Sequence, residues 1–185
     1  MNNALVVGSL AQIAQAQNVS IAESFLNVDA LILVDVSGSM DTTDSRGGQS
    51  RYDVALQELA RLQGDLPGKL AVIGFSSTSQ FVPNGRPAMI GSGTNLAGAL
   101  EFVHVADDGD MRFIVISDGQ PDEEEKALAV AAKFQGRIDG VYVGPEDDNR
   151  GRLFLERLSK AHGGRAVVAA QACELASKTE RLLLT

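Results

Sequence analysis

The sequence has few of the residues that bind soft metals or cross-link a chain. Cys173 is the single cysteine among 185 residues, which excludes an intrachain disulfide framework and a zinc site built from several cysteines. We expect Cys173 to be a small apolar residue of the last helix. The two histidines, His104 and His162, are far apart in sequence, and we expect both to fill core or surface positions of helices. Oxygen chemistry is therefore expected at any functional site.

Basic residues are also scarce, and none occurs before Arg46. A net charge of −8 argues against a basic arm for nucleic acid and against a polybasic patch for membranes. The missing early cations argue against a secretory signal. No apolar run approaches the roughly 20 residues that span a bilayer. We therefore expect a cytoplasmic protein that binds neither nucleic acid nor membrane.

What the sequence does contain is a regular alternation of strand-like and helix-like segments. The predicted strands are apolar runs of strand length, at 29–35, 69–75, 111–119, 138–144 and 165–170. The predicted helices are at 9–25, 50–66, 121–136, 149–164 and 171–185, with another that begins after the loop at 91–96. Runs without polar alternation are typical of parallel strands covered on both faces. The pattern predicts an α/β fold, a doubly wound sheet with helices on both faces.

Two segments fall outside that simple repeat. Pro83 is poorly tolerated in a central strand, so 79–85 is predicted to be a short edge strand. The helix at 9–25 has no breaker, and we expect it to be an accessory within an N-terminal segment 1–27 that packs on a domain spanning 28–185.

Two of the predicted strands end in aspartate, at Asp35 and Asp118. In a doubly wound sheet, ligands bind beyond the carboxyl ends of the strands, where the strand order reverses. If these strands are neighbours they lie about 4.8 Å apart, and two unpaired carboxylates would repel each other. A divalent cation between them removes that repulsion.

The residues around Asp35 predict which cation this is. Ser37 and Ser39 follow at alternate positions, and Gly38 lets the backbone turn so that both hydroxyls point the same way as Asp35. With Asp118 they offer only hard oxygen donors, which suit Mg²⁺, Mn²⁺ or Ca²⁺. A site with few charged ligands and several neutral hydroxyls is more typical of Mg²⁺ than of Ca²⁺. The alternative interpretation is a turn whose polar side chains satisfy backbone donors.

Thr94 is a further candidate ligand. It lies in the loop "GSGTNL", 91–96, where Gly91 and Gly93 allow a flexible approach to the same crevice. Thr94 also stands where the next helix begins, and a role as N-cap alone explains it equally well.

Together these segments resemble the von Willebrand factor type A (VWA) domain with its metal-ion-dependent adhesion site. The resemblance is carried by "DVSGSM" at 35–40, "GSGTNL" at 91–96 and "VISDGQPD" at 115–122, and it extends over roughly 28–170. All five family positions are filled, by Asp35, Ser37, Ser39, Thr94 and Asp118.

The resemblance implies a Rossmann-like, mostly parallel sheet with one short antiparallel edge strand, which 79–85 would supply. It implies that the two serines ligate the metal directly, and that Thr94 and the aspartates do so directly or through water. It also implies that one coordination position stays open for an Asp or Glu side chain of a protein partner. In several members the last helix, here about 171–183, moves when the metal shell rearranges.

Two other functions compete with this binding module. A Mg²⁺-dependent phosphotransferase or hydrolase would use Asp35 as nucleophile, but such enzymes commonly carry a second carboxylate where Ser37 stands, and no His or Lys lies in the motif. A structural subunit without metal would not need the complete set of oxygen ligands. We therefore expect a protein that is not an enzyme. The acidic residues Asp107, Asp108, Asp110 and 122–125 are interpreted as a solvated rim, or as selection against other acidic partners.

Overall fold

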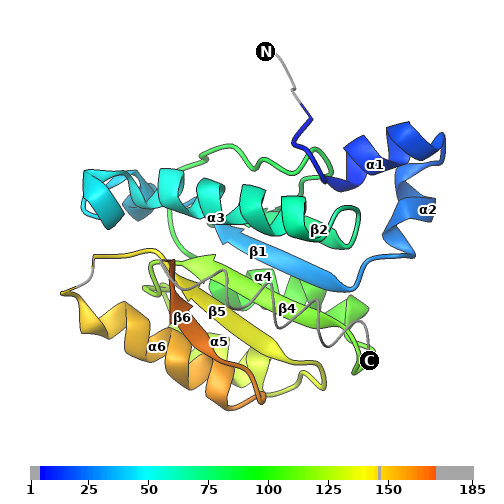
Figure 1. The fold of residues 1–185 in the computed structure, drawn as a ribbon. Coiled ribbons are helices and arrows are strands. Elements are labelled where there is room, and N and C mark those ends of the chain that lie inside the picture. The colour runs from blue at the N-terminus through cyan, green and yellow to red at the C-terminus, as the bar shows by residue number, and fades with distance from the viewer. Residues whose placement is uncertain (1–4, 146, 170–185) are drawn as a thin grey trace.

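The computed structural model describes residues 5–145 and 147–169, which form a sheet with helices on both faces (Figure 1). The strands are β1 (Ala30–Asp35), β2 (Leu70–Phe75), β3 (Ser79–Phe81), β4 (Arg112–Ser117), β5 (Ile138–Tyr142) and β6 (Ala166–Val168). Their order in the six-stranded sheet is β3-β2-β1-β4-β5-β6. All neighbours are parallel except β2 and β3. The predicted α/β fold and its antiparallel edge strand are confirmed, although the edge strand predicted over 79–85 ends at Phe81, before Pro83.

Each central strand contributes to two hydrophobic cores, because successive side chains of a strand point to opposite faces. In β1, Leu31 and Leu33 join the core beneath one layer of helices, whereas Ala30, Ile32 and Val34 join the core on the other face. Every residue of β1 is buried. This two-sided burial explains why the strands lack polar alternation.

The helices form two layers around the sheet (Figure 1). One face is covered by α3 (Arg51–Asp65), which begins after the N-cap Ser50, as predicted. The other face is covered by three helices: α4 (Leu96–Val103), α5 (Glu124–Ala131) and α6 (Asn149–Lys160). Two short 3₁₀ turns, η1 (Gly38–Asp41) and η2 (Arg46–Gly48), lie between β1 and α3, and a third, η3 (His104–Ala106), follows α4.

The N-terminal segment differs from the prediction of one helix over 9–25. It forms α1 (Leu10–Gln17) and α2 (Ile21–Phe25), separated at Asn18, whose backbone is left-handed with a φ of 56°. Ser20 then starts α2 through a capping box with Glu23. An asparagine that tolerates the left-handed region and a strong N-cap together end one helix and begin another.

Other differences concern helix ends. The helix predicted at 121–136 is shorter at both ends, because α5 begins at Glu124 and ends at Ala131. The predicted last helix, 171–185, and Cys173 lie outside the described residues. Within the described part of the chain, no helix is both long and apolar enough to cross a membrane.

Candidate metal centre

The two aspartates that end predicted strands lie at the same edge of the sheet. β1 and β4 are parallel neighbours, with Val34 opposite Ile116. Asp35 is the last residue of β1, and Asp118 follows Ser117 at the end of β4. This is the switch point, because the chain continues from β1 to β2 on one side while β4 lies on the other. Both carboxylates are fully buried.

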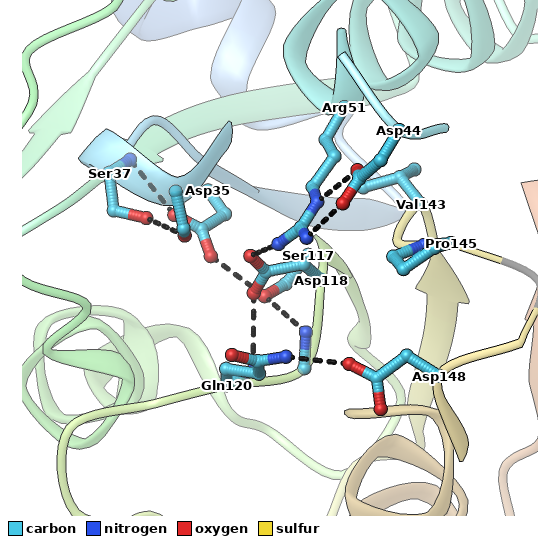
Figure 2. Close-up of polar contacts among 12 residues, drawn as sticks. Asp35, Ser37, Asp44, Arg51, Ser117, Asp118, Gln120, Val143, Pro145 and Asp148 are labelled. Carbon is cyan, nitrogen blue, oxygen red and sulfur yellow. Dashed lines mark hydrogen bonds and ion pairs between the residues drawn. The ribbon is translucent and has the colours of Figure 1, made fainter. Parts of the chain in front are cut away.

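A tight turn follows Asp35, and Figure 2 shows Ser37 beside the Asp35 carboxylate. The Ser37 backbone N–H donates to Asp35 Oδ1 at 2.9 Å, and the chain then enters the 3₁₀ turn η1. The hydroxyls of Ser37 and Ser39 are 3.2 Å apart. Ser37 is fully buried and Ser39 is half-buried, so the hydroxyl pair leads from the buried carboxylate toward the surface.

Burial makes the charged form of the Asp35 carboxylate unfavourable. Burial, together with the nearby negative charge of Asp118, raises the pKa of Asp35 from its ordinary 3.8 to about 6. Hydrogen bonds from Ser37 and from the Ser117 hydroxyl, at 2.7 Å, oppose this rise because they stabilise the charged form. A cation at this place would remove the remaining penalty on the charged carboxylate.

The loop that carries Thr94 packs against this turn. The backbone N–H groups of Ile90 and Gly91 donate to the Val36 carbonyl at 3.2 and 3.1 Å, and the Ser92 carbonyl accepts from the Gly38 N–H at 3.1 Å. Thr94 itself is buried, with an exposed fraction of 6%.

Thr94 is not the N-cap of the following helix. That role belongs to Asn95, whose side chain accepts from the Gly98 N–H at 2.9 Å. The Thr94 N–H instead donates to Asp122 Oδ2 at 2.9 Å, and the Thr94 carbonyl accepts from the Asp122 N–H at 3.0 Å. The loop after β4 thus holds the Thr94 loop through Asp122, and the capping interpretation of Thr94 is wrong.

Asp118 has a partner that the motif did not predict. Its Oδ2 accepts a hydrogen bond from Arg51 Nη1 at 2.6 Å, and its Oδ1 accepts from the Gln120 N–H at 3.1 Å (Figure 2). The rest of the Arg51 guanidinium donates to Asp44, from Nε and Nη2, at 2.7 Å each. Arg51 therefore bridges the polar loop before α3 and the end of β4.

The donors that gather here fit a hard divalent cation by their chemistry. They comprise two carboxylates and the hydroxyls of Ser37 and Ser39, with a threonine on the adjoining loop. Among residues 5–145 and 147–169, no group of three or more His, Cys, Asp or Glu side chains has a metal-binding arrangement. A site in which hydroxyls supply most ligands is not a cluster of that kind, and its oxygen donors suit Mg²⁺ or Mn²⁺ rather than zinc.

Sequence reasoning missed three residues of this centre: Arg51, Asp44 and Ser117. Arg51 was detectable, because a basic residue at the first position of a helix opposes the helix dipole and so indicates another role. Asp122 was read only as part of an acidic rim, although its contacts are with Thr94. Asp44 and Ser117 carry no comparable signal, since polar residues are common in such loops and at strand ends.

Known proteins resemble this chain in structure rather than in sequence. No family model and no curated protein matches it. The structure of an aerotolerance-related membrane protein from Bacteroides fragilis, carrying multiple mutations to serines, aligns with a TM-score of 0.67 at 16% identity, over 83% of this chain and 97% of that one. The SpRpn10 VWA domain aligns with a TM-score of 0.56 at 12% identity, over 75% and 86%.

A third structure is that of the manganese-loaded TRAP protein of Plasmodium vivax. It aligns with a TM-score of 0.51 at 20% identity, over 69% of this chain and 62% of that one. At such low identities these alignments describe the fold, which agrees with the strand order and the antiparallel edge strand β3. The chain has the fold of von Willebrand factor type A domains.

Proposed function

We propose that this chain is a metal-dependent module for binding another protein. A divalent cation, Mg²⁺ by preference and otherwise Mn²⁺ or Ca²⁺, would be held by the side chains of Asp35, Ser37, Ser39, Thr94 and Asp118. The bound ion would supply a positive centre with one open coordination position at the surface. An Asp or Glu side chain of a protein partner would take that position, because neutral hydroxyl ligands leave the ion electrophilic.

The observation that carries the proposal is the buried Asp35 carboxylate with two hydroxyls leading outward from it. Full burial raises the pKa of Asp35 to about 6, and the contacts from Ser37 and Ser117 do not offset this. A charged carboxylate in that position gains from a cation. The manganese-loaded TRAP structure, which shares the fold, supports a divalent ion as the ligand.

The contacts of Asp35 weaken the alternative in which this residue is an enzymatic nucleophile. One carboxylate oxygen accepts from the Ser37 N–H and the other from the Ser117 hydroxyl. A fully buried carboxylate with both oxygens engaged is poorly placed to attack a phosphate ester. Release of phosphate from generic esters with Mg²⁺, lost in Asp35→Ala, would favour the enzyme instead.

Titration of Mn²⁺ and Mg²⁺ by calorimetry tests the metal. We expect affinity to fall about tenfold or more in Ser39→Ala and in Asp118→Ala, since each removes one ligand. Ser159→Ala is the matched control, because its buried hydroxyl lies in α6 and, within the described structure, has no hydrogen-bond partner. Equal affinity in all four proteins would contradict the shared site.

Capture of a partner is tested with the wild-type protein as bait, with Mg²⁺ and with EDTA. We expect a partner to be retained only with the ion, and to be lost in Ser39→Ala. A partner held equally well in EDTA would show that binding does not pass through the metal.

A further inference from the structure

Arg51 is a buried cation beside Asp118, one of the five candidate ligands. It occupies the first position of α3, only 8% of it is exposed, and its guanidinium donates to two carboxylates (Figure 2). Nη1 contacts Asp118 at 2.6 Å, while Nε and Nη2 contact Asp44 at 2.7 Å. Arg51 and Asp118 are separated by 67 residues in sequence, so this contact exists only in the folded chain.

The helix does not explain a cation at this position. The N-terminus of a helix carries partial positive charge, which disfavours a basic residue in the first turn. Ser50 caps the helix, and Asp53 in the first turn suits the dipole. Arg51 is stabilised instead by its two carboxylates, whose contacts raise its pKa further above its ordinary value. Its place is set by Asp44 and Asp118.

The ion pair bears directly on Asp118 as a metal ligand. Arg51 occupies Oδ2, and the Gln120 N–H occupies Oδ1. A carboxylate engaged at both oxygens donates less to another cation, and a guanidinium beside the site repels a divalent ion. Asp35 has no such ion pair among the described residues, since its two contacts are an N–H and a hydroxyl.

We propose that Arg51 is a built-in counter-ion that competes with the divalent cation for Asp118 and so lowers the metal affinity of the site. The proposal rests on the proposed function and names a residue that regulates the metal affinity of the site. When the ion is absent, Arg51 neutralises Asp118 and keeps the end of β4 folded against α3. When the ion binds, it must compete with the Arg51–Asp118 ion pair for the Asp118 carboxylate. The site therefore binds its cation more weakly than its ligand set alone would allow.

Calorimetry with Mn²⁺ alone tests this in wild type, Arg51→Met and Arg51→Lys. We expect Arg51→Met to bind Mn²⁺ about tenfold more tightly, because the competing charge is gone. Lysine keeps the charge but cannot form the fork that holds two carboxylates, so Arg51→Lys is expected between the two. Arg61→Met is the matched control: Arg61 lies in the same helix and pairs with Glu58, and its variant should match wild type.

A second readout separates competition from a merely structural role. Thermal unfolding with and without Mn²⁺ should show a larger stabilisation by Mn²⁺ in Arg51→Met than in wild type, since the ion replaces a lost counter-charge. Weaker or unchanged Mn²⁺ binding in folded Arg51→Met would overturn the inference while leaving the proposed function intact. If Arg51→Met does not fold without metal, Arg51→Lys decides, and an affinity at or below that of wild type overturns the inference. Absence of Mn²⁺ binding in every protein would overturn both.

Discussion

Replacing Asp35 with asparagine should make the metal-free protein more stable, although the same change removes a proposed ligand. Asparagine has nearly the same shape, and its side-chain oxygen can still accept the hydrogen bond from the Ser37 N–H. What it removes is a negative charge that is fully buried and lies near Asp118. The charged form of Asp35 is the source of the penalty, and asparagine is never charged.

The expected gain follows from the pKa of Asp35. A rise from 3.8 to about 6 means that, above pH 6, the ionised carboxylate destabilises the folded state by about 3 kcal/mol. The asparagine amide would face the Ser117 hydroxyl, which now donates to Asp35 and would have to accept instead, at a cost of about 1 kcal/mol. The net gain is about 2 kcal/mol, or about 4–8 °C in Tm for a chain of this size.

The gain should depend on pH in a defined direction. The folded-state pKa of Asp35 lies above its unfolded value, so its contribution to stability is fully present below about pH 4 and is lost as the pH rises through about 6. Asparagine avoids that loss. The advantage of Asp35→Asn over wild type should therefore be largest near pH 7.5 and disappear near pH 4.

The assay is thermal or urea unfolding in EDTA at several pH values between these limits. Asp118→Asn is the control of opposite sign: it removes a carboxylate paired with Arg51 and should destabilise the protein by about 2–3 kcal/mol. An Asp35→Asn protein less stable than wild type at pH 7.5, or an advantage that does not vary with pH, would refute the electrostatic account of Asp35. A confirmed gain would mean that the carboxylate is kept for binding at the expense of stability.

Three further substitutions test how the site is supported. Gly151→Ala in α6 would place a methyl group against the Asp118 carbonyl oxygen. We expect the free energy of unfolding in urea to fall by about 2–3 kcal/mol and Mn²⁺ binding by calorimetry to weaken. Unchanged values would show that the loop at Asp118 moves to accommodate the methyl group. Asp122→Asn weakens the hydrogen bond that the Asp122 side chain accepts from the Thr94 N–H. We expect Mn²⁺ affinity to fall about threefold and the free energy of unfolding to fall by less than about 1 kcal/mol. Unchanged Mn²⁺ affinity would argue against a supporting role for Asp122. Asp139→Asn removes the buried counter-charge of two arginines at the start of β4 and β5. We expect the free energy of unfolding in urea to fall by about 3 kcal/mol, with Mn²⁺ affinity unaltered. A change in Mn²⁺ affinity would mean that any loss of stability weakens metal binding.

Local sequence patterns predicted most of the elements. Apolar runs such as 30–35 and 70–75 are strands because both their faces are buried, and Ser50 begins a helix because its side chain caps it. The apolar run and the capping residue can both be recognised from residues that are neighbours along the chain. The N-terminal segment was mispredicted for a local reason as well: Asn18 adopts a left-handed backbone that apolar periodicity does not reveal.

The five candidate ligands were also found from the sequence, because polar residues directly after apolar strands are conspicuous. Their types and spacing indicated a hard cation. Whether Thr94 caps a helix could not be read from spacing, since Asn95 is as good an N-cap and stands one residue later. The choice depends on Asp122, a residue 28 positions away that holds the Thr94 N–H.

By itself the sequence determined which segments become strands and helices, and which oxygen donors stand at the strand ends, because apolar runs and capping residues can be recognised within a few consecutive residues. Only the tertiary structure decided that β1 and β4 are neighbours, so that Asp35 and Asp118 lie at the same edge of the sheet. It also decided that Arg51 forms an ion pair with Asp118. Strand order and buried ion pairs depend on contacts between residues that are distant in the chain, and a pattern within one segment does not specify which distant segment it will contact.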